Sequence, residues 1–188
     1  MASKFGVDRP YAVYAGQLRM AHKNLDGLIS AFAICRRELG DTVRLVLVGK
    51  RSWTTSDLDG FIEKAGLNGS VILTGHINTD ELSFALSGAR MLAFPSRSEG
   101  FGLAVVEAMA CGTPVVAANA TSLPEVVGDA GILVDPESPV DIAAGMTRLF
   151  TDSQLASELR IRGLRRACQF SWKLAAEETL SLYTDLPH

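Results

Sequence analysis

The sequence lacks the features that mark several large classes of protein. Nowhere in its 188 residues does an apolar run reach the roughly 18 residues that a membrane-spanning helix needs, so no such helix is expected. Residues 1–10 contain no apolar stretch typical of a signal peptide. The net charge of -3 at pH 7 argues against a nucleic-acid partner, which requires a basic surface.

Cysteine is scarce and scattered. Cys35, Cys111 and Cys168 are odd in number and far apart, which favours reduced thiols in a cytoplasmic protein over disulfides or a zinc site. We therefore expect a cytoplasmic location. The arginine-rich stretch 160–166 is interpreted as a solvated helix face. The alternative is contact with an anionic partner or peripheral contact of the full-length protein with the inner face of a membrane.

Short apolar segments alternate with helical patterns along the whole chain. Continuous apolar runs predict strands at 11–15, 43–48, 70–74, 91–94, 114–118 and 131–134. Helical spacing, with Asn24 as a cap and Gly40 as a stop for the first, predicts helices at 24–39, 57–65, 80–87, 103–110, 139–150, 154–168 and 172–183. This alternation predicts an α/β fold, a Rossmann-like doubly wound parallel sheet of about six strands with helices on both faces. We expect this domain over 11–188, and 1–10 as a linker from a missing N-terminal domain.

The expected strand order places a ligand-binding crevice at one point of the sheet. In the common order 3-2-1-4-5-6 the winding reverses between the first and fourth strands, and ligands bind beyond the carboxyl ends of the strands there. The loop 16–23 follows the first strand, and a glycine-containing loop follows the fourth. Both loops should therefore face the same crevice.

The segment 94–112 is the most informative in the chain. It passes from a strand end through a glycine turn at 100–102 into a predicted helix. A glycine-flanked helix start presents free N–H groups and a partial positive charge, which suit a phosphate. Glu99 and Glu107 flank this turn, and carboxylates suit hydroxyl groups. Phosphate together with hydroxyls indicates a nucleotide or a nucleotide sugar.

A nicotinamide dinucleotide fits the same segment less well. Gly100 and Gly102 match the start of the dinucleotide fingerprint, but Val105 replaces its third glycine. The residues after the next strand, 119–121, include no acid for a ribose. A dehydrogenase is therefore disfavoured.

The paired glutamates stand in a longer pattern, Phe94-Pro95-Ser96…Glu99-Gly100-Phe101-Gly102…Glu107-Ala108-Met109-Ala110-Cys111-Gly112-Thr113-Pro114. This pattern closely resembles the C-terminal donor-binding domain of the family-four retaining glycosyltransferases, which are group 1 glycosyl transferases of the GT-B fold. Corroborating segments follow in the family's order over nearly the whole chain, at 11–16, 22–24, 45–49, 74–76, 123–128, 131–136 and 170–172.

The resemblance implies a role for each matching residue. Glu107 would accept hydrogen bonds from the ribose, Glu99 would orient the donor sugar, and Lys23 would neutralise the departing diphosphate. Further donor contacts are implied for three loops: Gly16, Gln17 and Arg19; Gly75, His76 and Ile77; and Gly100, Phe101, Gly102 and Leu103. Gln17 stands where the family has an arginine, and Arg19 is the candidate replacement.

The implied reaction moves a hexosyl unit from a donor such as a UDP- or GDP-hexose to an acceptor hydroxyl, with retained configuration and without a metal or cofactor. Its acceptor would bind a separate N-terminal domain, so this domain alone should be inactive, and polysaccharide biosynthesis is the expected setting. One alternative is a non-catalytic nucleotide-sugar-binding module. Another is a related GT-B epimerase or phosphorylase, of which the pyridoxal type would need Lys23 or Lys50 in the cleft.

Other polar residues are interpreted without a catalytic role. His22 is expected as a loop residue beside Lys23, and His76 as part of the wall near the base. Asp57 and Asp59 resemble a metal-binding pair, but they stand at a predicted helix start, where acids are common. No metal site is therefore expected.

Overall fold

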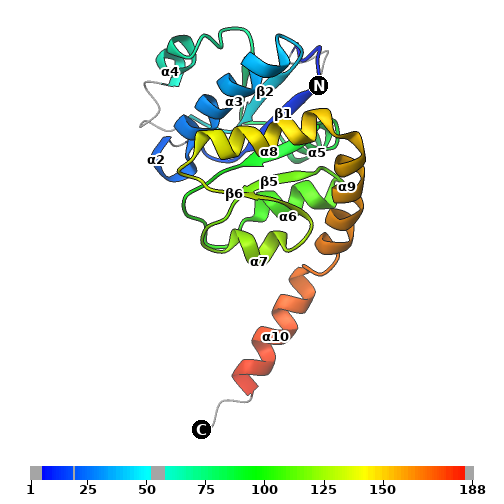
Figure 1. Cartoon of the computed structure of the whole chain (residues 1–188). Coiled ribbons are helices and arrows are strands. Elements are labelled where there is room, and N and C mark those ends of the chain that lie inside the picture. Colours follow the sequence, from blue (N-terminus) through cyan, green and yellow to red (C-terminus); the bar gives the residue numbers. More distant parts are fainter. Residues whose placement is uncertain (1–5, 19, 52–57, 185–188) are drawn as a thin grey trace.

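A parallel sheet forms the centre of the molecule (Figure 1). The computed structural model describes residues 6–18, 20–51 and 58–184. The strands are β1 (Tyr11–Ala15), β2 (Arg44–Val48), β3 (Val71–Gly75), β4 (Met91–Phe94), β5 (Val115–Ala118) and β6 (Gly131–Val134). They lie in the order β3-β2-β1-β4-β5-β6, and every neighbouring pair is parallel. The predicted doubly wound α/β fold is confirmed, and each strand lies within one residue of its predicted bounds.

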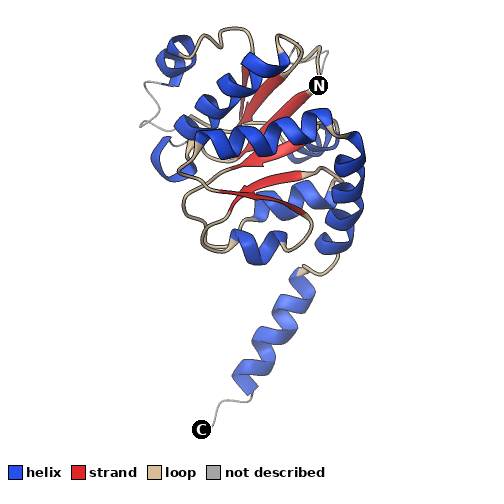
Figure 2. Ribbon diagram, viewed as in Figure 1, coloured by secondary structure: helices blue, strands red, loops and turns tan. Residues whose placement is uncertain are grey.

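Burial along the strands follows their place in the sheet. Every residue of β1, β2, β4 and β5 is buried, whereas β3 and β6 are partly exposed because they form the two edges. Helices cover the sheet on both faces (Figure 2). Continuous apolar runs are the sequence pattern expected of strands enclosed in this way.

Helices connect the strands of the described chain and follow the last of them. They are α2 (Met20–Lys23), α3 (Leu25–Leu39), α4 (Leu58–Lys64), α5 (Thr79–Ser87), α6 (Leu103–Ala110), α7 (Leu123–Val127), α8 (Pro139–Thr151), α9 (Ser153–Ala167) and α10 (Trp172–Thr184). Helix α3 packs along α8, as Figure 1 shows, and α6 packs against α7 and α9.

The predicted helices agree with these bounds to within one residue, although Asp57 lies outside the described residues. The two short helices α2 and α7 were not predicted, because a single turn leaves too little periodicity to detect. The capping role expected of Asn24 is wrong. Its backbone is left-handed, with φ 54°, and its side chain makes no capping bond to α3.

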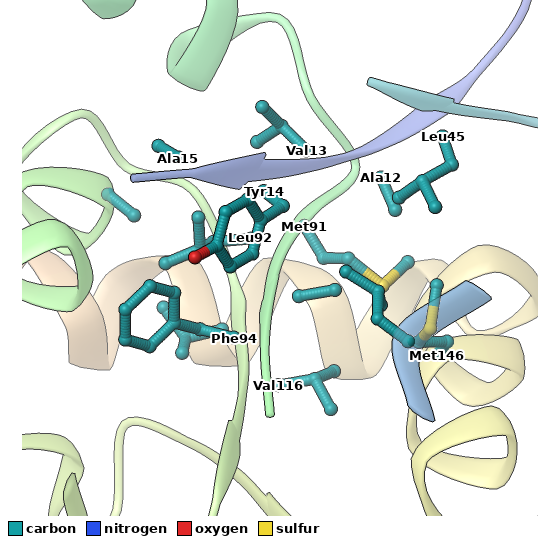
Figure 3. Packing of buried hydrophobic residues seen from close by; sticks show 14 of the residues in the cluster. Ala12, Val13, Tyr14, Ala15, Leu45, Met91, Leu92, Phe94, Val116 and Met146 are labelled. Atoms are coloured by element: carbon teal, nitrogen blue, oxygen red, sulfur yellow. The ribbon is translucent and has the colours of Figure 1, made fainter. Parts of the chain in front are cut away.

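Two stacked aromatic rings close the core beneath the crevice. Tyr14 of β1 and Phe94 of β4 lie side by side, with ring centres 5.6 Å apart (Figure 3). The Tyr14 hydroxyl donates a 3.1 Å hydrogen bond to the carbonyl of Gln17. Burial, reinforced by the charge of Glu99, raises the pKa of Tyr14 above its usual range, so the hydroxyl stays protonated and holds the loop after β1.

Helix α10 stands apart from the rest of the domain. It projects away from the sheet in Figure 1, and none of its residues is buried. Large apolar side chains on it are exposed, among them Trp172, Leu180 and Tyr183. No helix of the described chain combines the length and the apolar character needed to cross a bilayer. The predicted domain limits, 1–10 and 11–188, stay predictions.

A glycine at the end of β2 permits the closest backbone approach near the crevice. Gly49 has φ 146°, and its N–H donates to the carbonyl of Gly75 at 3.0 Å. A Cβ atom at this position would lie 1.8 Å from the carbonyl oxygen of Gly16. The ends of β1, β2 and β3 can therefore converge only because residue 49 has no side chain.

The Gly49→Ala substitution should lower the free energy of unfolding by at least about 3 kcal/mol, since overpacking adds to the backbone strain. Gly40→Ala is the matched control, because its φ is also positive, at 70°, but nothing lies within 4 Å of its added Cβ. That control should cost only about 1 kcal/mol. Urea denaturation measures both, and equal losses would contradict the close approach.

Candidate functional site

A hollow of about 450 Å³ opens at the carboxyl ends of the strands where the sheet reverses its winding. Five residues predicted as donor contacts line it: Gly16, Gln17, His76, Ile77 and Glu107. Residues that were not assigned to the donor site complete the wall: Ala15, Val48, Gly49, Lys50, Leu82 and Ala104. The structure thus brings the loops after β1 and β3 together with α6, as the switch-point argument predicts.

The turn before α6 is shaped by a glycine and leaves the helix start open. Gly102 has φ 106°, and a Cβ there would lie 2.7 Å from Cδ2 of Leu123. No side chain caps α6 at this end. Its first N–H groups and the positive end of its dipole are therefore available to an anion.

A loop that the sequence did not single out holds this turn in place. The Ser122 hydroxyl donates to the carbonyls of Glu99, at 3.1 Å, and Phe101, at 2.9 Å. The Thr121 hydroxyl accepts from the N–H of Glu99 at 3.2 Å. In the sequence these contacts are marked only by two neighbouring hydroxyl residues before Leu123, which give no indication of the groups that they bind.

Glu107 faces the hollow from the second turn of α6. Partial burial raises the pKa of its carboxyl group. Among the described residues its carboxylate has no hydrogen-bonding partner. It is thus an acceptor at the wall of the hollow that is free to bind a hydroxyl group.

The two predicted catalytic residues meet in an ion pair. Lys23 Nζ lies 2.6 Å from Glu99 Oε1, and the side chains are only 22% and 12% exposed. Lys23 Nζ also lies 6.0 Å from the centre of the Phe94 ring. The two residues lie 76 positions apart, Lys23 at the end of α2 and Glu99 in the loop after β4. The sequence predicted separate ligand contacts for them but not that they would pair.

Other predicted residues lie elsewhere. Arg19 falls outside the described residues. Gly75 ends β3 without lining the hollow, while Phe101 and Leu103 border a second, apolar hollow of about 440 Å³ beside Phe170 and the start of α10. The ring of Phe101 meets that of Phe170 edge-on, with centres 5.7 Å apart.

Two of the polar residues set aside from the sequence, Asp59 and Arg166, have structural partners. Asp59 pairs with Arg51, and in the described part of the chain no cluster of three or more histidine, cysteine or acidic side chains could hold a metal ion. Arg166 donates to the carbonyls of Glu125 and Val126 at the end of α7. Part of the arginine-rich stretch is therefore a helix cap and not merely a solvated face.

Comparisons with known proteins agree with this geometry. Residues 2–166 match the family model described as Glycosyl transferases group 1. The chain belongs to this family. Its sequence is 37% identical over 173 residues to the O-antigen chain mannosyltransferase B of Escherichia coli, a match that covers 92% of this chain and 45% of the relative.

Solved structures of glycosyltransferase type share its fold. The chain matches sucrose-phosphate synthase from Thermosynechococcus elongatus with a TM-score of 0.83 and 29% identity, covering 95% of this chain and 45% of that one. It matches Anabaena Alr3699/HepE, solved in complex with UDP and glucose, with a TM-score of 0.88 and 25% identity, covering 98% and 51%. This group 1 chain thus spans about half the length of these proteins, and the predicted GT-B fold and family are confirmed.

The raised pKa of Glu107 predicts a pH-dependent effect on stability. A carboxyl group whose pKa is higher in the folded state destabilises the fold when it is ionised, and this penalty is absent at acid pH, where the group is neutral in both states. Glu107→Gln should therefore raise the free energy of unfolding at pH 7 by about 0.5 kcal/mol, because exposure to solvent keeps the effect small. The gain should vanish near pH 4, at about the ordinary carboxyl pKa.

Glu63→Gln on α4 is the control, since Glu63 is an exposed carboxylate away from the hollow. It should show no such pH-dependent gain. Urea denaturation at the two pH values measures both variants. A gain for Glu107→Gln that persisted at acid pH would show that burial of the charge is not its cause.

Proposed function

We propose that this chain is the nucleotide-sugar-binding domain of a retaining glycosyltransferase. The carrying observation is that an open helix start, a free carboxylate and a lysine converge where the sheet reverses its winding. Anion and hydroxyl contacts are thereby provided by α6, and Lys23, which does not itself line the hollow, is paired with the loop that leads into this helix. The complex of the similar HepE protein with UDP and glucose supports a nucleoside diphosphate sugar as the donor.

The proposed placement of the donor follows the geometry. The diphosphate lies at the start of α6, which no side chain caps, and the ribose hydroxyls donate to Glu107. The base lies against the wall formed by His76 and Ile77. The donor sugar extends towards Glu99.

In the proposed reaction the bond between the sugar C1 and the β-phosphate oxygen breaks, and the nucleoside diphosphate leaves with the electron pair. The acceptor hydroxyl oxygen bonds to C1 with retained configuration, and its proton passes to the departing β-phosphate oxygen. Lys23 and the dipole of α6 offset the negative charge that grows on the leaving group, and we propose that they do so without a metal.

The transferred sugar and the remaining protein are part of the same proposal. The O-antigen mannosyltransferase relative favours a hexosyl donor, mannosyl among the first to test, and a role in polysaccharide assembly. Since the chain spans less than half of that relative, the acceptor is proposed to bind a further domain. Trp172, Leu180 and Tyr183 on α10 expose apolar surface of the kind that such a domain could cover. The chain alone should then bind donor without turnover.

Calorimetric titration of the 188-residue chain with UDP, GDP, ADP and their hexose conjugates tests this function. One nucleotide should bind selectively, and Glu107→Gln should weaken both that nucleotide and its nucleoside by about tenfold, because both carry the ribose. Glu63→Gln should bind as the wild type does. Absence of binding by any nucleotide would refute the proposed function, and full binding by Glu107→Gln would remove Glu107 from the ribose contact.

The Lys23–Glu99 pair predicts effects of opposite sign. Lys23→Met should weaken the affinity for the nucleoside diphosphate without its sugar by about tenfold or more, since it removes a charged hydrogen-bond donor. Glu99→Gln should instead increase the affinity for the nucleoside diphosphate without its sugar, because it removes the carboxylate that competes for Lys23. The same variant should lose the additional affinity that the sugar confers. A weaker affinity for this nucleoside diphosphate in both variants would contradict this competition.

A further inference from the structure

Three segments from distant parts of the chain meet around Lys23. They are α2 with the residues after it (20–26), the loop after β4 (95–99) and the loop before α8 (135–138). Asn24, fully buried, donates through Nδ2 to the carbonyls of Pro95 at 2.9 Å and Pro136 at 2.6 Å. This one amide therefore joins all three segments on the inner side.

Arg97 joins the same three segments on the outer side. Its Nε donates to Glu137 Oε1 at 2.7 Å. Its Nη1 donates to the carbonyl of Ala21 at 3.0 Å and to Asp26 Oδ1 at 3.3 Å. Its backbone N–H donates to the carbonyl of His22 at 3.1 Å. The side chain is 31% exposed, so these bonds are partly shielded from water.

These contacts hold the backbone on both sides of Lys23. The carbonyl of His22, directly before it, accepts from the Arg97 N–H and from the Ser96 hydroxyl. Asn24, directly after it, is tied to Pro95. The loop that makes these contacts also bears Glu99, two residues beyond Arg97. The place of Lys23 relative to Glu99 and α6 is therefore fixed by bonds that neither residue makes itself.

We propose that Arg97 is a positioning residue for Lys23. It holds α2 against the loop after β4, so that the amine meets the diphosphate without a further loss of backbone freedom. Its bonds to Glu137, Asp26 and Ala21 point it at protein acceptors, so it acts through Lys23 and not on the ligand. The inference rests on the proposed function, because it assigns a supporting residue to the same site.

A double-mutant cycle on the 188-residue chain tests the role. Wild type, Arg97→Met, Lys23→Met and the double variant are titrated with UDP and GDP and with uridine and guanosine. Arg97→Met should weaken the affinity for the diphosphate by about tenfold and leave the affinity for the nucleoside unchanged. In the Lys23→Met background it should cause no further loss, because the residue through which it acts is gone. Additive losses would overturn the proposal and indicate a direct contact with phosphate.

Glu137→Gln separates the two roles by the sign of its effect. If Arg97 positions Lys23, weakening its 2.7 Å bond to Glu137 should weaken diphosphate binding. If Arg97 instead bound the ligand, the loss of a competing carboxylate should strengthen binding, which would overturn the proposal. Arg162→Met is the matched control, since Arg162 pairs with Asp129 on the α9 side of the domain, and it should bind as the wild type does.

Hydrogen exchange provides a readout that needs no ligand. Arg97→Met should speed exchange of the amides of 20–26 and 95–99 and leave β5 unchanged, and Arg97→Lys should restore part of the protection. Unchanged exchange would refute the positioning role, whether or not the wild type binds a nucleotide. A failure of the wild type to bind any nucleotide would by itself refute only the proposed function. Faster exchange throughout the chain in Arg97→Met would indicate general destabilisation. Arg97→Lys and Glu137→Gln then decide the question. If both variants showed the exchange and the binding of the wild type, the positioning role would be overturned.

Discussion

The parallel pairing of β1 with β4 is the constraint on which the site depends. Only Ala12 with Met91 and Val13 with Leu92 are paired in register, and beyond them the Tyr14 and Phe94 rings continue the contact by stacking. Because the winding reverses at this pairing, the loops that leave the two strands diverge to opposite sides. Space for a ligand opens between them, and the glutamate of one loop can still reach the lysine of the other.

The strand order could be predicted from the sequence because burial on both faces leaves a strong pattern. The buried runs of β1, β2, β4 and β5 permit few residues other than apolar ones, and their alternation with helices restricts the topology. Glu107 and Gly102 could likewise be placed, since both lie in a local pattern around one helix start. Local spacing was sufficient for these features.

The contacts around Lys23 could not be predicted in the same way, because they depend on side chains that cross between loops. Asn24 precedes a helix and is of a residue type that commonly caps helices, yet its side-chain amide donates to carbonyls 71 and 112 positions away. Its fully buried side chain lies against Gly27 of the helix but makes no capping bond there. Arg97 lies among polar residues in a loop, where a solvated side chain is the ordinary expectation. Only the folded arrangement distinguishes these residues from their neighbours.

The ion pair between Lys23 and Glu99 places an internal counterion in the site. A diphosphate that binds the amine competes with a carboxylate that already neutralises it at 2.6 Å. An anionic ligand that takes the place of Glu99 beside Lys23 leaves this carboxylate, whose side chain is mostly buried, uncompensated unless the ligand also satisfies it. A sugar does so with hydroxyl groups. A compound that places a cation beside its phosphate would replace both halves of the pair at once, so zwitterionic character is a design rule for inhibitors of this site.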